Sequence, residues 1–392
     1  MMSIEDKRVL VGFLEALFNG ISIGAVLLIA ALGLAIIFGL MGVINMAHGE
    51  LMMFGAYATF VVQNGCKELG GVWFEFYIFL ALIISFLFTA VLGLILERGV
   101  IRYLYGRPLE TLLATWGVSL ICQQFVRSVN WLLVIGIVLF SLLFFVGLQI
   151  LNYRSNLGKV RNWAVAVLLF LSLGIAIVTG NLFSNQQALT LPWFGAQNVD
   201  VTAPSWLQEG ISLIGVQLPF ARLFIIALTI VCVAGTYLFL QGSNWGLRIR
   251  AVTQNRSMSA CLGIPTKKVD AITFALGSGL AGVAGCAISL LGSVGPNTGQ
   301  NYIIDTFMVV VVGGVGNLAG TILAALGIGT ANFLIGSGTL AFLFSPIQPL
   351  ADLLNFFATT SMAKVLVFAL IIAFLQWKPA GIFAPKGRTV DV

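Results

Sequence analysis

The sequence is poor in charge and lacks the motifs of most enzymes and cofactor-binding proteins. Only 9% of its 392 residues are charged, it has a single histidine, His48, and its five cysteines are scattered without a C-x-x-C pair. A soluble domain carries about 25% charged residues. The chain contains no G-x-x-x-x-G-K-S/T, no H-E-x-x-H and no G-x-S-x-G. These absences give no support for an enzyme, an ATP-binding subunit, or a metal or other cofactor site.

Long apolar runs take the place of the missing charge. Of all residues 59% are hydrophobic, and the mean hydropathy is +1.04. A helix that spans a bilayer needs about 20 mostly apolar residues, and the short alternating strands of a β-barrel are absent. The expected fold class is therefore all-α. It is a single polytopic domain over residues 1–392, surrounded by membrane lipid, with roughly 10 to 11 transmembrane helices.

Ten apolar runs are candidate spans: 11–39, 50–64, 75–97, 109–128, 131–151, 162–182, 222–241, 269–291, 304–336 and 363–377. The run 304–336 is too long for one crossing, and its stretch GGVGNLAG predicts two helices joined by a turn. Residues 1–8 are charged and lead into the first run without a small-residue cleavage site. An uncleaved first helix is therefore expected, and not a signal peptide.

The basic residues predict the orientation of the chain. Fourteen of the twenty Lys and Arg residues, with one acid, lie in the segments 98–107, 152–161, 242–268 and 378–392. The positive-inside rule places these four segments in the cytoplasm. The acidic or neutral loops 183–221 and 337–362 then face outward. The net charge of +6 reflects this topology and not nucleic-acid binding.

The stretch GVINMAHGELMMFGAYATF, residues 42–60, interrupts the apolar pattern with Asn45, His48 and Glu50. Its glycines and Asn45 break helical continuity. Non-helical backbone at membrane depth is tolerated only where protein covers it or where it lines a wet cavity. One interpretation is a break that lines a transport pathway. The other is an external turn in which His48 and Glu50 are solvated. His48 is expected to be a hydrogen-bonding group and not a metal ligand.

The remaining candidates for such a pathway are Asn297, Gln300, Asp305, Gln123 and Gln124. The first three lie in GPNTGQNYIID, where they either line an outer mouth or, in the case of Asp305, cap the start of a helix. The two glutamines lie in the run 109–128 and either face the pathway or hydrogen-bond between helices.

The longest cytoplasmic segment is 242–268, with five basic residues and no acid before Asp270. Between Arg250 and Gly263 its pattern predicts one short amphipathic helix, ended by Gly263 and Pro265. Such a helix either anchors the loop at the membrane surface or docks onto a cytoplasmic partner.

The block 246–263 resembles the coupling loop of ABC importer permeases. FGLMGVINMAHGELMMFGAY, GSGLAGVAGC and DTFMVVVVGGVGNLAG are similar to segments of the branched-chain amino acid type of these permeases. RAVTQNRSMSACLGI and FGAQNVDVTAPSWL look closest to the urea permease branch. The resemblance covers most of the chain and implies the type II-like permease fold of this family, in a bacterial plasma (inner) membrane.

By this resemblance the chain is the translocation subunit of an ATP-driven importer, most similar to importers of urea. The implied partners are a second similar permease subunit, two cytoplasmic ATP-binding subunits and a substrate-binding protein on the outer face. The residues implied in coupling to the ATPase are Arg250, Ala251, Gln254, Asn255, Ala260 and Gly263.

Two alternatives to the urea importer stay open. The same architecture carrying branched-chain or other amino acids would favour a half-helix N-terminus or a charge pair in the pathway; no clear pair is visible in the sequence. A stand-alone urea channel would need no coupling loop.

The chain departs from the family pattern at about 129–193. This region reads as an insertion of two helices joined by a basic hairpin from Tyr153 to Arg161. An even number of added helices leaves the topology of the following spans unchanged.

Overall fold

A computed structural model shows the arrangement of the chain and describes residues 4–153, 161–213, 216–344 and 348–383. The basic hairpin expected between Tyr153 and Arg161 lies almost entirely outside the described residues. The same holds for 384–392 of the last cytoplasmic segment. The chain forms two compact units, one of Met1–Leu120 with Val199–Val392 and one of Ile121–Asn198.

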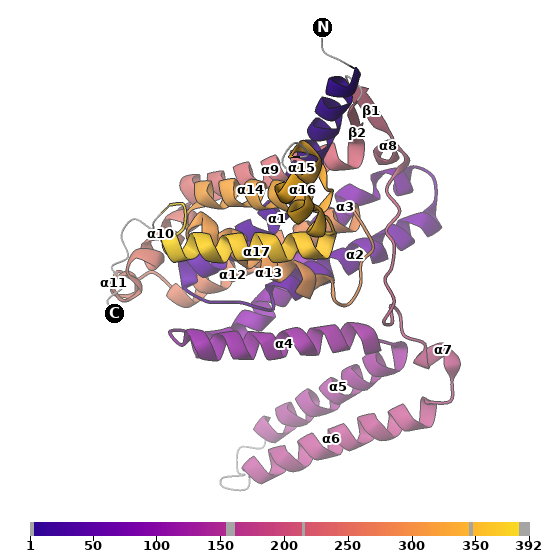
Figure 1. Cartoon of the computed structure of the whole chain (residues 1–392). Coiled ribbons are helices and arrows are strands. Elements are labelled where there is room, and N and C mark those ends of the chain that lie inside the picture. Colours follow the sequence, from indigo (N-terminus) through magenta and orange to yellow (C-terminus); the bar gives the residue numbers. More distant parts are fainter. Residues whose placement is uncertain (1–3, 154–160, 214–215, 345–347, 384–392) are drawn as a thin grey trace. The chain divides into compact units, whose positions relative to one another are not determined.

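Helices make up most of the larger unit (Figure 1). They are α1 (Ile4–Met41), α2 (His48–Leu69), α3 (Val72–Gly99), η1 (Ile101–Leu104), the first part of α4 (Pro108–Ser128), α8 (Ser205–Gln208), α9 (Phe220–Gly242), α10 (Asn244–Gln254), α11 (Arg256–Cys261), α12 (Thr266–Ser289), α13 (Thr298–Gly313), α14 (Leu318–Gly336), α15 (Thr339–Leu343), α16 (Gln348–Phe356) and α17 (Thr360–Trp377).

The all-α membrane fold is confirmed. Seven of the described helices are long and apolar enough to cross a membrane, namely α1, α3, α5 (Trp131–Tyr153), α6 (Arg161–Phe183), α9, α12 and α14. The shorter or less apolar α2, α4, α13 and α17 cover the remaining predicted spans. The run 304–336 is two helices, because Gly314 (φ +96°) and Gly316 (φ +83°) form the turn between α13 and α14.

Helix α1 is the central helix of the larger unit. A Cβ atom added at Gly33 would lie 2.4 Å from the carbonyl oxygen of Gly277 in α12. One added at Gly24 would lie 2.8 Å from that of Ala325 in α14. Small residues therefore let three helix backbones touch, which is the usual packing device of membrane helices.

Contacts at the two ends of α1 show which loops lie at each face of the larger unit. Near its start, the carboxylate of Glu15 accepts a hydrogen bond of 3.0 Å from the backbone N–H of Gln217. Near its end, Gly39 packs against Gly316 of the α13–α14 turn. Helix α1 therefore begins beside the loop 183–221, which the basic residues place outside, and ends at the opposite face.

The outer loop contains a hairpin that the sequence did not predict. Strands β1 (Gly210–Leu213) and β2 (Val216–Pro219) pair antiparallel, with Ile211 opposite Leu218. Each strand has only four residues, which is too short for a clear alternation of polar and apolar positions.

The smaller unit is a helical hairpin of α5 (Trp131–Tyr153) and α6 (Arg161–Phe183), followed by the short α7 (Gln187–Thr190). Its two ends meet, because the N–H of Trp193 donates to the carbonyl of Val129 at 2.9 Å. The rings of Trp131 and Trp193 also pack edge to face. This closure of 129–193 agrees with a self-contained insertion, which stays a prediction.

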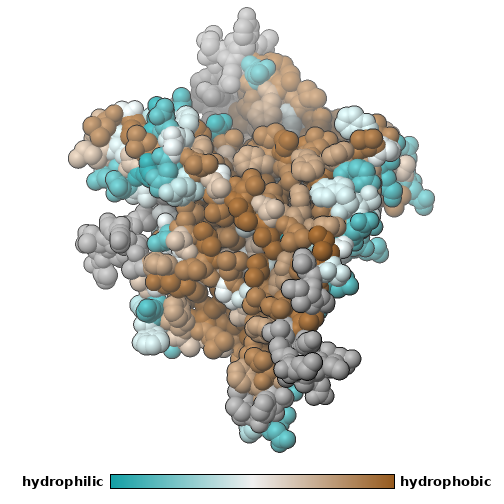
Figure 2. Space-filling view, turned by 90° about the horizontal axis from the view of Figure 1, so that it is seen from above, coloured by the Kyte–Doolittle hydropathy of each residue, from teal (hydrophilic) through white to brown (hydrophobic). Residues whose placement is uncertain are grey.

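The face of the molecule drawn in Figure 2 has an apolar belt. In Figure 2 hydrophobic residues cover the centre of the visible face, and hydrophilic residues gather toward its left and right edges. Such a belt is what lipid chains require, with polar residues at the two interfaces.

Candidate functional site

The helix break at 42–47 leads from the end of α1 back into the interior of the bundle. Helix α1 ends at Met41, Gly42 adopts φ +67°, and α2 begins only at His48. The Nε2 atom of His48 lies 3.1 Å from the carbonyl oxygen of Ala30. Ala30 precedes the end of α1 by eleven residues, or about 16 Å at 1.5 Å per residue. The chain therefore turns back into the bundle before α2 starts.

The three polar residues of the break are buried in protein. Asn45, His48 and Glu50 are at most 1% exposed. Helix α4 closes the group, because Ser119 Oγ donates to Glu50 Oε1 at 2.8 Å and Thr115 Oγ1 accepts from the N–H of Met46 at 3.1 Å. The interpretation of a solvated external turn is therefore wrong, while the pathway role of these residues stays a prediction.

Two atoms of this group have no hydrogen-bond partner among the described residues: Asn45 Nδ2 and His48 Nδ1. A carbonyl oxygen only accepts, so the contact with Ala30 requires the proton of His48 on Nε2. Nδ1 is then an acceptor. A buried unpaired donor and a buried unpaired acceptor are costly unless water or a polar solute satisfies them.

A second helix begins beside α2. Helix α13 starts at Thr298, and a Cβ atom added at Gly49 would lie 2.3 Å from the carbonyl oxygen of Gly299. Two helix N-termini thus meet inside the bundle. Each carries partial positive charge from the helix dipole. Paired broken helices of this kind form the substrate site in several transporter folds.

The structure corrects the expected role of Asp305. Because α13 starts at Thr298, Asp305 lies in the middle of the helix and is not its cap. Asn297 precedes the helix, and both Asn297 and Gln300 are exposed near its start. Asp305 is 4% exposed, and its Oδ2 accepts from Lys364 Nζ of α17 at 2.8 Å. This charge pair was not visible in the sequence.

The pair lies in a cavity of about 670 Å³ between α1, α9, α13, α14, α17 and the loop after α12. Polar lining residues are Arg222, Asn301, Tyr302, Asp305, Asn332, Ser337, Ser361 and Lys364. Arg222 is near the start of α9, Ser337 follows α14, and Ser361 is near the start of α17. These ends adjoin the loops 183–221 and 337–362, so the cavity lies in the half of the bundle that the basic residues predict to face outward.

The predicted coupling helix is in fact two helices, α10 and α11 (Figure 1). The single helix expected between Arg250 and Gly263 is wrong, because Asn255 adopts an extended conformation between them. Its side chain accepts from the N–H of Met258 at 2.9 Å and caps α11. Gly263, at φ +80°, ends the segment as expected.

The residues implied in coupling are mostly accessible. Gln254, Asn255, Ala260 and Gly263 are exposed, while Ala251 is half-buried. Arg250, also half-buried, donates to the side chain of Gln241. Two apolar side chains of the same segment, Met258 and Leu262, are 58% and 75% exposed. Exposed apolar side chains in a Lys- and Arg-rich segment, predicted to face the cytoplasm, suit contact with a protein partner.

Comparison with known proteins matches this arrangement to a transporter family. The family model described as "Branched-chain amino acid transport system / permease component" matches residues 16–375. The chain belongs to this permease family. Escherichia coli (strain K12) LivH, a high-affinity branched-chain amino acid transport system permease protein, is 25% identical over 373 residues, 94% of this chain and 95% of LivH. Pseudomonas aeruginosa BraD, described likewise, is 25% identical over 321 residues, 81% and 85% of the two chains.

The permease is therefore a transport subunit and not an enzyme, and it is a multi-pass protein of the bacterial plasma membrane. Permeases of ABC importers work with ATP-binding subunits and a substrate-binding protein. No solved structure matches the chain.

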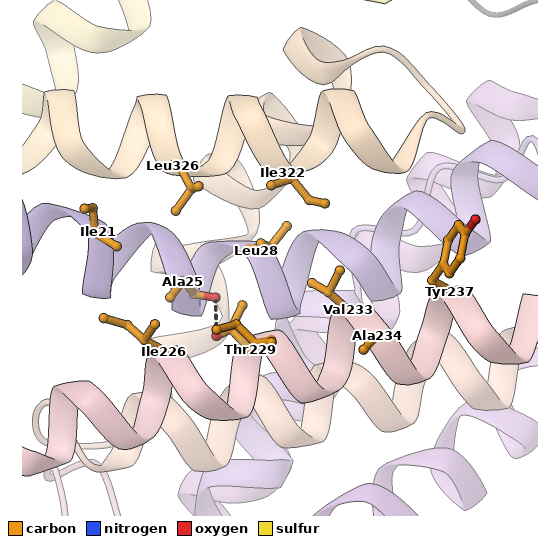
Figure 3. A pocket seen from close by; sticks show the side chains of 11 residues that line it. Ile21, Ala25, Leu28, Ile226, Thr229, Val233, Ala234, Tyr237, Ile322 and Leu326 are labelled. Carbon is orange, nitrogen blue, oxygen red and sulfur yellow. Dashed lines mark hydrogen bonds between the residues drawn. The ribbon is translucent and has the colours of Figure 1, made fainter.

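A second cavity of the permease is unsuited to a polar substrate. Figure 3 shows this cavity of about 490 Å³ between α1, α9 and α14. Its lining is aliphatic apart from Thr229 and Tyr237. The hydroxyl of Thr229 already donates to the carbonyl of Ile225 at 2.7 Å and lies 3.2 Å from that of Ala25. A polar solute would find little to bind here.

Gln123 and Gln124 belong to the smaller unit of the permease. Gln123 is 6% exposed, whereas Gln124 is exposed and donates to Ser128 Oγ at 3.2 Å. The contact of Gln124 is local to α4, and the place of both glutamines in a pathway stays a prediction.

A charge cluster that the sequence did not reveal lies between the coupling segment (residues 244–263, with α10 and α11), the end of α3 and the start of α12. It consists of Glu97, Arg102, Tyr105, Arg256 and Asp270. Burial, with the nearby carboxylates of Asp270 and Glu97, raises the pKa of Tyr105 above its ordinary value. Its hydroxyl therefore stays protonated and donates to Glu97 Oε1 at 3.3 Å. The available signal in the sequence was Asp270, the first acid after the five basic residues of 242–268.

Proposed function

We propose that this permease carries an amino acid zwitterion inward as part of an ATP-driven importer. The observation that supports this substrate is the pair of Asp305 and Lys364 beside Arg222 in the outward cavity. A zwitterion presents a carboxylate to a cation and an ammonium to an anion. The cavity offers both, and its volume lies in the range of about 300–1,000 Å³ typical of small-molecule sites.

The ion pair also gives a physical reason for substrate exchange. A buried carboxylate needs a cation and hydrogen-bond donors to remain charged. When the substrate ammonium replaces Lys364 at Asp305, the freed lysine and Arg222 receive the substrate carboxylate. Charge balance is kept at each step, so entry needs no unpaired buried charge. Aliphatic lining residues such as Ile23 and Leu27 suit a branched apolar side chain.

From this cavity the substrate passes to the break between α1 and α2. Asn45 and His48 offer a donor and an acceptor there, and the N-termini of α2 and α13 favour the carboxylate. Docking of α10 and α11 onto ATP-binding subunits drives the change of access. We further propose a second homologous permease subunit and two ATP-binding subunits, with a substrate-binding protein at the outward cavity.

Urea is the second candidate substrate, because RAVTQNRSMSACLGI and FGAQNVDVTAPSWL resemble the urea branch. Urea is neutral and planar, with N–H donors and one carbonyl acceptor. The neutral polar groups at the break suit it, whereas the charge pair is not needed for it. A stand-alone urea channel would not require the coupling segment.

The test is uptake of labelled leucine and labelled urea by cells with and without the gene, each with and without ATP depletion. Loss of ATP-dependent leucine uptake alone is the expected result. Loss of urea uptake alone would agree with an ATP-driven importer but would show that its substrate is urea and not an amino acid. Urea flux that continues without ATP would contradict the coupling to an ATPase.

A further inference from the structure

Arg256 ties the coupling segment to the interior of the permease. It is the first residue of α11, and its guanidinium carbon lies 4.8 Å from the ring centroid of Tyr105. Its Nη2 donates to Asp270 Oδ2 at 2.5 Å. Tyr105 follows η1, and Asp270 lies near the start of α12. One side chain therefore connects α11 with the residue that follows η1 and with α12.

The cluster around Arg256 is anchored in the bundle by Glu97. This residue lies near the end of α3 and is 0% exposed. It accepts from Arg102 Nη2 at 3.1 Å and from the hydroxyl of Tyr105 at 3.3 Å. Two acids and two bases balance in the cluster. Because Asp270 is also buried, at 3% exposed, removal of Arg256 would leave it without its cation.

Asp270 belongs to the helix that touches α2 most closely. A Cβ atom added at Gly285 of α12 would lie 1.9 Å from the carbonyl oxygen of Met52. One added at Gly55 of α2 would lie 2.4 Å from that of Gly282. No side chain separates the two backbones at these points. Since close-packed interiors transmit displacement, a shift of α12 moves α2, which begins at His48.

We propose that Arg256 is the positioning residue that transmits movement of α10 and α11 to α12, and through α12 to the helix break. This role rests on the proposed docking of the segment onto an ATP-binding subunit. The side chain of Arg256 is 45% exposed and that of Asp270 is 4% exposed. The pair thus joins the accessible segment to a helix of the core.

The test uses the permease purified with its ATP-binding subunits and reconstituted in proteoliposomes. The variants are Arg256→Gln, Asp270→Asn and the double variant. Lys267→Gln is the matched control, because it removes a positive charge from an exposed residue of the same segment. Three quantities are measured: co-purification of the ATP-binding subunits, the midpoint of thermal unfolding, and labelled substrate transported per ATP hydrolysed.

Arg256→Gln is expected to keep the ATP-binding subunits bound and ATP hydrolysis active. Substrate transported per ATP falls at least about fivefold, the lower end of usual coupling effects. Its unfolding midpoint also falls, because Asp270 remains buried without its cation. The double variant regains the midpoint, since the buried charge is gone, but not the transport ratio. A merely structural role would restore both together.

Three results would overturn the proposal. One is a transport ratio in Arg256→Gln equal to that of Lys267→Gln. Another is loss of the ATP-binding subunits from Arg256→Gln, which would make Arg256 a docking contact. The third is recovery of the transport ratio in the double variant. If a bulky residue at Gly263 also leaves the ratio unchanged, the docking itself is wrong; if that variant uncouples while Arg256→Gln does not, only the role of Arg256 is wrong.

Discussion

Gly49 and Gly299 meet backbone to backbone where α2 and α13 begin. A Cβ atom at Gly49 would lie 2.3 Å from the carbonyl oxygen of Gly299, and one at Gly299 would lie 2.5 Å from that of Gly49. Carbonyl oxygens of helix backbones cannot move aside as flexible side chains do. This contact therefore fixes the two helix N-termini relative to each other inside the membrane.

Gly49→Ala is expected to destabilise the permease by about 1–3 kcal/mol through overpacking and to abolish uptake. Gly65→Ala on the same helix is the matched control, because nothing lies within 4 Å of its added Cβ. In a helix interior the control change is expected to stabilise by up to about 1 kcal/mol. Thermal unfolding and uptake are measured for both variants; equal behaviour of the two would contradict the close contact.

Access to the helix break is expected to change during transport. Asn45 is 1% exposed in the structure, so a cysteine at this position should react slowly with a water-soluble thiol reagent in this state. Adding nucleotide to the assembled importer should change the rate. The native exposed thiol of Cys261 is first removed. A cysteine at Glu209 in the outer loop gives the control rate, and labelling of position 45 as fast as this control in every state would contradict a pathway.

The effects of Asp305 and Lys364 on the free energy of unfolding are expected to be coupled. Lys364→Gln leaves the buried carboxylate without its cation and should lower the free energy of unfolding by roughly 1–3 kcal/mol. The double variant Asp305→Asn with Lys364→Gln should recover most of this loss. Thermal unfolding of both singles and the double gives the interaction energy. Additive losses would show that the two side chains do not act together.

Docking of the coupling segment is tested at Gly263. Gly263→Trp meets no atom within 4 Å of the new Cβ, although its φ of +80° makes the change locally unfavourable. The variant is expected to insert in the membrane normally but to lose transport while ATP hydrolysis continues. Gly242→Trp, at another open position without positive φ, is the control. Unchanged uptake by Gly263→Trp would show that the segment is not a docking site.

The sequence was sufficient to predict the membrane-spanning helices of this permease, since each is a local apolar run. The short helices α7, α8, α15 and α16 in the loops 183–221 and 337–362 were not predicted. The two-helix nature of 304–336 and the break at 42–50 were also readable, because Gly and Asn break helices wherever they occur. The division of the coupling segment at Asn255 was missed although its signal is local. Asn is a favoured helix N-cap, and here it starts α11 after α10 has ended.

The charge pairs could not be predicted from the sequence, because they depend on how the helices pack. Lys364 and Asp305 are 59 residues apart, and only the contact of α17 with α13 brings them together. A hint was present, since Lys364 is the sole charged residue of α17. A lysine within an apolar run needs a partner or a polar cavity. The partner itself could not be named before the structure.

One measurement decides whether the outward cavity receives a zwitterion through this charge pair. It is ATP-driven uptake of labelled leucine by the reconstituted importer carrying Asp305→Asn with Lys364→Gln. The matched control is Arg107→Gln with Glu110→Gln, which neutralises an exposed ion pair of 3.1 Å. The cavity variant is expected to fold but to lose leucine uptake, while the control transports normally. Leucine uptake that is equal in the two variants would contradict this expectation.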